Sequence, residues 1–146
     1  MSCSRGLLVL LLAGLFGLAA YVRLAPDDPA RWHVALAEIA GEAEAVSPVI
    51  RQVPGGAVAF LPAADPAAAL ARLAEVAEAS PRTRRLAGSL DEGRITWIAR
   101  SQLIGFPDYI SAETTDRGLR IWSRQRYGRG DLGVNLRRLT DWLGRM

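Results

Sequence analysis

The chain opens with an unbroken apolar run from Gly6 to Val22, after a start whose only charged side chain is Arg5. As a helix this run is about 25 Å long, close to the ~30 Å hydrocarbon core of a bilayer. The pattern predicts a single membrane-spanning segment over residues 1–23. We place Gly6, Leu12 and Val22 inside the membrane anchor and Arg23 at its end.

A cleaved secretory signal is the alternative to an anchor. Gly17-Leu18-Ala19 offers a small-x-small cleavage site. The apolar run continues past that site, however, and Tyr21 and Arg23 suit a membrane interface. The positive amino terminus precedes the run, and Asp27 and Asp28 follow it. We therefore expect a single-pass anchor in a bacterial inner membrane, with the carboxy-terminal domain in the periplasm.

The next segment, residues 24–56, is interpreted as a linker. Pro26 and Pro29 prevent the first helix from continuing. The Ala/Glu-rich stretch 34–46 predicts at most a short helix, because Gly41 interrupts it and Pro48 follows it.

Ordered structure is expected to begin at Ala57, where residues 57–61 form a short strand after a Gly-Gly turn. Asp65 and Pro66 then supply an N-cap and a first-turn proline, which predicts a helix. Leu70 and Leu73 lie on the apolar stripe of that helix. The helix is expected to stop at Ser80-Pro81.

Beyond Pro81 the apolar period changes to two, which is typical of strands. Residues 94–103 alternate, with Ile95 and Trp97 on one face and Thr96 and Ile98 on the other. Short turns at 91–93 and 116–118 join this strand and its neighbours (85–90, 109–115 and 119–127) into antiparallel pairs.

The last segment returns to helical spacing, with its leucines from Leu132 to Leu143 on one face. The order is therefore strand, helix, meander of strands, helix. We predict an α+β domain over residues 57–146, an antiparallel sheet with helices on one face.

Charge is divided unevenly along the chain. All 18 basic residues are Arg; residues 25–80 carry a net charge of −5 and residues 81–146 one of +6. This asymmetry marks either an anionic partner or an acidic segment packed against a basic sheet, and we favour the second. Cys3 precedes the apolar run and His33 is the only histidine. An internal disulfide is therefore excluded and a His/Cys zinc site is not expected. We expect no metal and no cofactor.

Residues 124–139 read RQRYGRGDLGVNLRRL. This segment resembles the carboxy-terminal signature of the family known as domain of unknown function 1499. The matching positions are Arg124, Arg126, Gly128, Asp131, Gly133, Asn135 and Arg138. Two shorter segments, Phe106-Pro107-Asp108 and SPRT at 80–83, also resemble elements of that family, so the resemblance covers about residues 57–146.

The chain departs from the family pattern at three places. Gly130 stands where the family usually has Ser, and Leu136 where it usually has Arg. An Asn-Cys-Val-Ser-Ser element found upstream in many members is missing, so any role tied to that thiol is absent here. The resemblance implies a fold but no activity.

A row of arginines is the strongest candidate site. Alternate residues from Arg120 to Arg126 fall on one face of the last strand, and Arg100 can share that face on a neighbouring strand. Such a row can grip a phosphate or carboxylate ligand, or form an internal ion-pair network with Asp131, Asp108 and Glu113 as partners. We favour the network over an anion site or a solvated face. The residues predicted to hold the fold or a ligand are Arg100, Arg124, Arg126, Asp108 and Asp131.

Two further segments have a chemical and a structural interpretation. Asp131 could act as a general base, but we expect Asp131 or Asn135 to cap the last helix and Gly133 to adopt a positive φ. The basic cluster at residues 81–85 is interpreted as a solvated turn, with lipid headgroups as the alternative. Export makes nucleic acid an unsuitable partner.

The sequence contains no Gly-x-Ser-x-Gly, P-loop or His-Glu-x-x-His pattern. We therefore predict a membrane-anchored, periplasm-facing, non-catalytic binding or assembly module of the cell envelope. Its expected partners are the bilayer and either an envelope protein or a small anionic ligand. The alternative is an envelope hydrolase or transferase that uses Asp108 or Asp131 on a phosphate or carboxylate substrate held by arginines.

Overall fold

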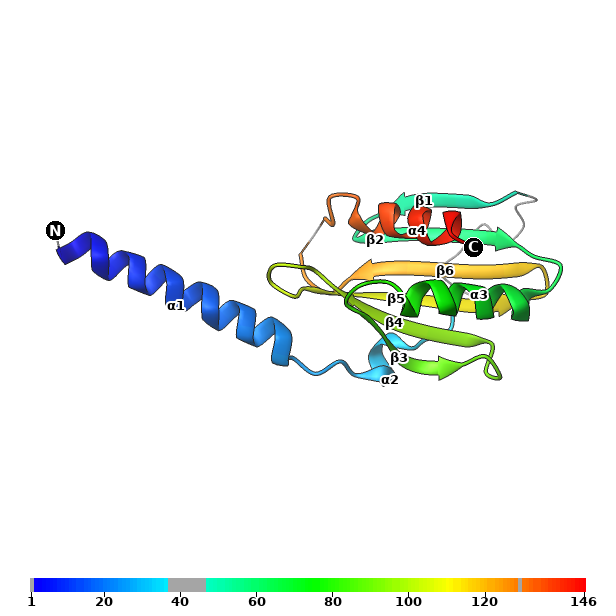
Figure 1. The fold of residues 1–146 in the computed structure, drawn as a ribbon, viewed down its shortest axis with the longest axis horizontal. Helices are drawn as coiled ribbons and strands as arrows, with labels where there is room; N and C mark the ends of the chain where they lie inside the picture. Colours follow the sequence, from blue (N-terminus) through cyan, green and yellow to red (C-terminus); the bar gives the residue numbers. More distant parts are fainter. Residues whose placement is uncertain (1, 37–46, 129) are drawn as a thin grey trace.

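The computed structural model describes residues 2–36, 47–128 and 130–146 (Figure 1). Its elements, in chain order, are α1 (Ser2–Leu24), α2 (Pro29–Trp32), β1 (Val49–Val53), β2 (Gly56–Pro62), α3 (Pro66–Glu78), β3 (Thr83–Ser89), β4 (Arg94–Arg100), β5 (Pro107–Thr115), β6 (Gly118–Gln125) and α4 (Val134–Gly144).

The strands form one antiparallel sheet in the order β1-β2-β6-β5-β4-β3. The predicted α+β class with an antiparallel sheet is confirmed. Strands β3 to β6 follow one another as the predicted meander, and β2 pairs with β6 from far along the chain. Gly56 is needed at this pairing, because a Cβ there would clash with the Ser123 carbonyl oxygen.

Helices α3 and α4 cover one face of the sheet (Figure 1). The Asp65 carboxylate accepts a hydrogen bond from the Ala68 N–H (3.0 Å) and caps α3, which buries Leu70 and Leu73. Trp97 of β4 meets Trp142 of α4 edge-on, with ring centroids 6.2 Å apart. The main hydrophobic core therefore lies between this sheet face and the two helices.

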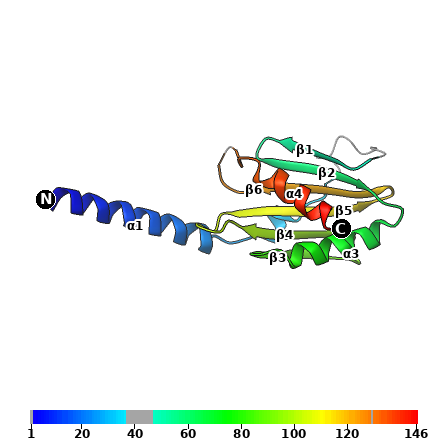
Figure 2. The same ribbon diagram turned by 45° about the horizontal axis from the view of Figure 1, so that its top comes forward.

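The opposite face of the sheet is covered by the segment that follows α1. Residues 25–36, here named the strap, include α2 and pass behind the sheet (Figures 1 and 2). The Trp32 ring stacks on Tyr109 of β5 at 3.8 Å between centroids and 5° between planes. Leu36 is also buried.

One expectation for this part of the chain was therefore wrong. Ordered structure begins before Ala57, because the segment 24–56 contains α2 and β1 and its first part packs on the sheet. The short helix considered within residues 34–46 stays a prediction, because residues 37–46 lie outside the described part of the chain; residues 34–36 are not helical.

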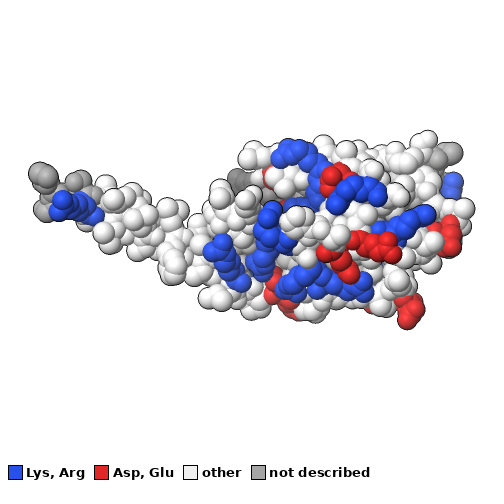
Figure 3. All heavy atoms as spheres, viewed as in Figure 1, with Lys and Arg blue, Asp and Glu red and all other residues white. Residues whose placement is uncertain are grey.

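Helix α1 extends away from the domain with nearly all of its surface exposed, and that surface is uncharged between the two ends (Figure 3). Residues 5–24 are long and apolar enough to cross a membrane, a property shared with signal sequences. The last turn of α1 touches the domain directly: Val22 is buried, and the Arg23 Nη2 donates to the Leu103 carbonyl oxygen (3.0 Å).

Candidate functional site

The strap is fixed to the sheet by one carboxylate, that of Asp27, whose side chain is 8% exposed. It accepts hydrogen bonds from Arg100 Nη2 at 2.7 Å, Arg84 Nη2 at 2.9 Å and the Tyr109 hydroxyl at 2.6 Å. Arg126 Nη1 lies 3.4 Å from Oδ1 of the same carboxylate. Three guanidinium groups from β3, β4 and the end of β6 therefore share a single acidic side chain.

Backbone carbonyl groups of the same segment are held as well. Arg126 Nη1 donates to the Pro26 carbonyl oxygen at 2.9 Å, and Arg100 Nη1 donates to those of Gly105 (3.0 Å) and Val22 (3.4 Å). Burial, followed by the hydrogen bond to Asp27, raises the pKa of Tyr109 to about 12. Its phenol group therefore stays neutral and acts as a hydrogen-bond donor to the carboxylate at physiological pH.

Arg124 lies deeper on the same face. Its guanidinium carbon is 3.9 Å from the Trp122 ring centroid and 5.3 Å from that of Trp32, and its Nη2 donates to the Trp32 carbonyl oxygen. Burial lowers the pKa of Arg124 to about 10. The rings supply cation–π stabilisation in place of a carboxylate.

The five predicted site residues do not form one cluster. Arg100, Arg124 and Arg126 contact the strap, whereas Asp108 bonds Arg138 of α4 at 2.9 Å on the helix-covered side. Burial raises the pKa of Asp108, although the charge of Arg138 acts against that rise. Glu113 also has another partner than expected, Arg94 at 2.9 Å. The sheet thus separates the predicted acidic partners Asp108 and Asp131 from the arginine row.

Asp131 and Gly133 organise the start of α4. The Asp131 carboxylate accepts hydrogen bonds from the N–H groups of Gly133 (3.1 Å) and Asn135 (2.9 Å), and from Gln52 Nε2 (2.9 Å). Gly133 has φ 73°, a value that favours glycine. Asn135 is buried, and its Oδ1 accepts hydrogen bonds from Ser123 and from Arg138 (2.6 Å).

Replacing Asp131 with alanine should lower the free energy of unfolding by about 1 kcal/mol at neutral pH, the usual effect of losing a helix cap. Burial alone would raise the pKa of Asp131, but the hydrogen bonds from Asn135, Gly133 and Gln52 outweigh it and lower that pKa below 3.8. The wild type should therefore lose this contribution as the pH falls below about 4, while the Asp131→Ala variant should not. Urea unfolding between pH 7 and pH 3 measures both effects.

The Asp141→Ala variant is the matched control for this loss. Asp141 lies on α4 itself, is 63% exposed and forms a surface ion pair with Arg145. Its removal should change the free energy of unfolding by less than about 0.5 kcal/mol. An equal loss in both variants would contradict a capping role for Asp131.

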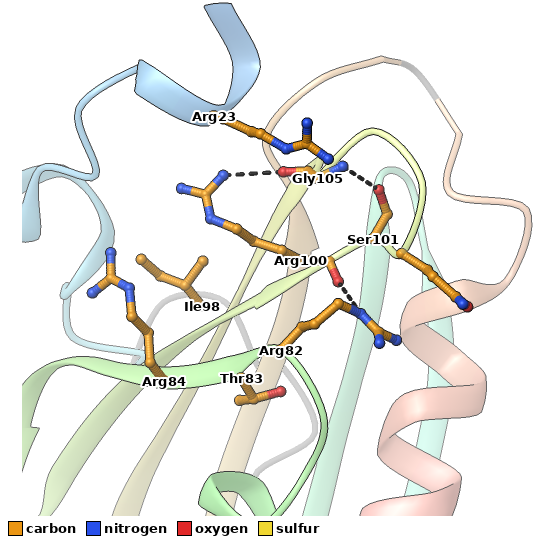
Figure 4. Close-up of a pocket in the computed structure, with 9 residues that line it drawn as sticks. Arg23, Arg82, Thr83, Arg84, Ile98, Arg100, Ser101 and Gly105 are labelled. Atoms are coloured by element: carbon orange, nitrogen blue, oxygen red, sulfur yellow. Dashed lines mark hydrogen bonds between the residues drawn. The ribbon is translucent and has the colours of Figure 1, made fainter. Parts of the chain in front are cut away.

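A basic pocket of about 390 Å³ lies where α1 meets the domain (Figure 4). Arg23 reaches it from α1, Arg82 and Arg84 from the start of β3, and Arg100 from β4. Ile98 lies between the arginines. Among the described residues no Asp or Glu lines this pocket.

Two of these four arginines have no carboxylate partner among the described residues. Arg23 donates to the Leu103 carbonyl oxygen, and Arg82 Nε donates to the Arg100 carbonyl oxygen at 3.3 Å. Among the described residues, no partner occupies the remaining guanidinium N–H groups of Arg23 and Arg82, which leaves them available to an anion. Arg84 and Arg100 share the Asp27 carboxylate with Arg126.

The structure thus adds three residues to those predicted, namely Asp27, Trp32 and Tyr109. It also brings the cluster at 81–85 next to the end of α1, which spacing along the sequence could not show.

Among the described residues there is no group of three or more His, Cys, Asp or Glu side chains that could hold a metal ion.

The model of one protein family, described as "Protein of unknown function (DUF1499)", matches residues 22–146. The match begins at Val22 and so includes the strap, earlier than the start at about residue 57 that the sequence segments suggested. No curated protein and no solved structure matches the chain.

Proposed function

The chain belongs to the DUF1499 family, and we propose that this member is a membrane-tethered, periplasm-facing, non-catalytic module of the bacterial cell envelope that binds a small anionic ligand. One observation carries the proposal. The basic pocket lies at the foot of an exposed apolar helix of membrane-spanning length, and its Arg23 and Arg82 guanidinium groups lack carboxylate partners in the described chain.

The chemistry of the pocket favours phosphate or carboxylate as the ligand. Arginine presents its N–H groups in a planar fork that fits the oxygens of these anions. The pocket receives arginines from α1, β3 and β4, so an anion bound there would contact several elements at once. Binding would also relieve the repulsion among guanidinium groups that share one Asp27 carboxylate.

The carboxylates of the rival hydrolase or transferase are engaged elsewhere. Asp108 holds Arg138, and Asp131 holds the first turn of α4, both on the far side of the sheet from the arginine row. A general base needs a free lone pair within reach of a substrate held by the arginines. This arrangement supports a binding role over a catalytic one.

Anion binding can be tested on the full chain in nanodiscs of neutral phosphatidylcholine. Calorimetric titration with inorganic phosphate, at constant ionic strength set with chloride, should show saturable binding to the wild type. The Arg23→Gln/Arg82→Gly variant should lose it, and Arg72→Gln, on the exposed side of α3, should retain it. Equal heats for all three proteins would contradict a phosphate site in this pocket.

The orientation can be tested with a reporter fused after Met146. A reporter that is active only in the periplasm should give signal, and one that is active only in the cytoplasm should not. The reverse result would contradict the proposed topology.

A further inference from the structure

We infer that the basic pocket binds the phosphate headgroup of an anionic phospholipid in the leaflet that faces the domain, at the carboxy-terminal end of α1. This inference rests on the proposed function and names the ligand class of the same pocket. It follows from where the pocket lies, what surrounds it and which of its groups are available.

The pocket lies at headgroup depth if α1 spans the bilayer. The apolar stretch ends at Leu24, Arg23 lines the pocket, and Val22 is already buried against the domain. No flexible connection separates the end of the span from the pocket, since Arg100 also donates to the Val22 carbonyl oxygen (3.4 Å). Because the span is about as long as the hydrocarbon core is thick, Arg23 falls at the lipid–water interface.

Exposed apolar side chains flank the same end of the domain. Leu103 is 86% exposed and Leu132 is 90% exposed. They lie in the loops that follow β4 and β6, and both loops are at the end of the sheet nearest α1 (Figures 1 and 2). Leu24, at the end of α1, is 81% exposed. Apolar side chains around a basic pocket match a membrane surface, in which acyl chains lie beneath charged headgroups.

The charge at this end is also suitable. Arginines gather on the domain close to α1 (Figure 3). Four of them line the pocket, and Asp27, which binds Arg84 and Arg100, is the only acidic partner that any of the four has among the described residues. A phosphodiester headgroup carries one negative charge and acceptor oxygens for several N–H donors. A protein partner with carboxylate groups could bind the same arginines, but it would not explain why exposed leucines lie at headgroup depth.

Arg82 provides an independent observation. Its φ of 56° lies in the left-handed region, where glycine is the relaxed residue. The turn nevertheless carries a long cation, whose Nε donates to the Arg100 carbonyl oxygen (Figure 4). Backbone strain of this kind is commonly found at binding sites.

The test uses the full chain in nanodiscs of phosphatidylcholine, with and without phosphatidylglycerol. After gentle extraction, native mass spectrometry measures how many lipids of each kind stay bound. The wild type should retain phosphatidylglycerol over phosphatidylcholine. The Arg23→Gln/Arg82→Gly variant should lose this preference by roughly fivefold for each guanidinium removed. Arg82→Gly suits the fold, because glycine accepts the positive φ at this position.

Two control variants make the result specific. Arg72→Gln removes one positive charge at the opposite end of the sheet, beside Leu61 and Pro62, and should keep the wild-type preference. Arg82→Lys retains a positive charge at this position and should keep much of the wild-type preference for phosphatidylglycerol. High salt should weaken it in every protein, because the pocket is open to solvent.

Equal retention of both lipids by the wild type, or an unchanged preference in the double variant, would overturn the lipid assignment. If phosphatidylglycerol is not preferred but inorganic phosphate still binds in neutral nanodiscs, the ligand is a free anion and the proposed binding function stands. If neither binds, both proposals fail.

Discussion

Replacing Asp27 with asparagine should lower the free energy of unfolding by about 3 kcal/mol, the scale for removing one partner of a buried ion pair. The substitution leaves Arg84, Arg100 and Arg126 without the carboxylate that they share, and Tyr109 without the acceptor of its hydroxyl group. Urea unfolding of the full chain in mild detergent, followed by tryptophan fluorescence, measures the change, because the four tryptophans lie in the strap, the sheet and α4.

The neighbouring residue provides a matched control. Asp28 caps α2 by accepting a hydrogen bond from the Ala30 N–H at 3.0 Å. Asparagine caps helices about as well as aspartate does, so Asp28→Asn should be nearly neutral while removing the same charge. Similar losses in the two variants would mean that net charge, and not the contacts of Asp27, sets the stability of this face.

The Arg100→Gln variant extends the argument. If Asp27 and Arg100 act through one another, the double variant Asp27→Asn/Arg100→Gln should lose less stability than the sum of the two single losses. If the two losses in the free energy of unfolding were strictly additive, Asp27 and Arg100 would act independently, which would contradict a shared network.

The spacing of apolar residues along the chain was sufficient to predict most of the helices and strands. Residues 94–103 were predicted to alternate, and they do so up to Arg100, where β4 ends, because one face of β4 packs on the helices and the other on the strap. The Asp65-Pro66 start of α3 was equally clear. Strand β1 was missed because it is an edge strand of five residues, half-buried or exposed throughout, so little alternation marks it.

The candidate site was less predictable, for a different reason. Alternation placed Arg120, Arg124 and their neighbours on one face, but it could not say which acidic residue would come to them from elsewhere. The Pro26-Asp27-Asp28-Pro29 sequence looked like a helix breaker and a linker. A tryptophan at position 32, within an otherwise polar stretch, was the one signal that this segment packs against something.

The division of charge takes on a meaning once the strap is in place. Asp27 belongs to the acidic half of the chain, and the arginines that surround it belong to the basic half. Glu78 of α3 and Arg85 of β3 form a second pair across this boundary at 2.6 Å. Part of the charge asymmetry is therefore neutralised inside the protein. The positive charge that remains at the carboxy-terminal end of α1 makes a binding pocket for an anion possible there.

Truncating Trp32 to alanine should release the strap from the sheet and lower the free energy of unfolding by about 3–5 kcal/mol, the usual range for a buried tryptophan. The substitution removes the ring that stacks on Tyr109 and one of the two rings beside Arg124. Once the strap opens, the peptide bond after Arg31 becomes accessible. Trypsin should then cleave the variant at this bond much faster than the wild type under native conditions.

The Trp142→Ala variant separates local release from general loss of stability. Trp142 is also buried, but it packs against Trp97 on the helix-covered face, away from the strap. Its loss should lower the urea midpoint by a similar amount without selective cleavage after Arg31. Trp32→Phe, which keeps a ring over Tyr109, should recover part of the protection. If all three variants were cleaved after Arg31 at the same rate relative to their global stability, the strap would unfold only with the whole domain. It would then be an integral layer of the fold that cannot open separately.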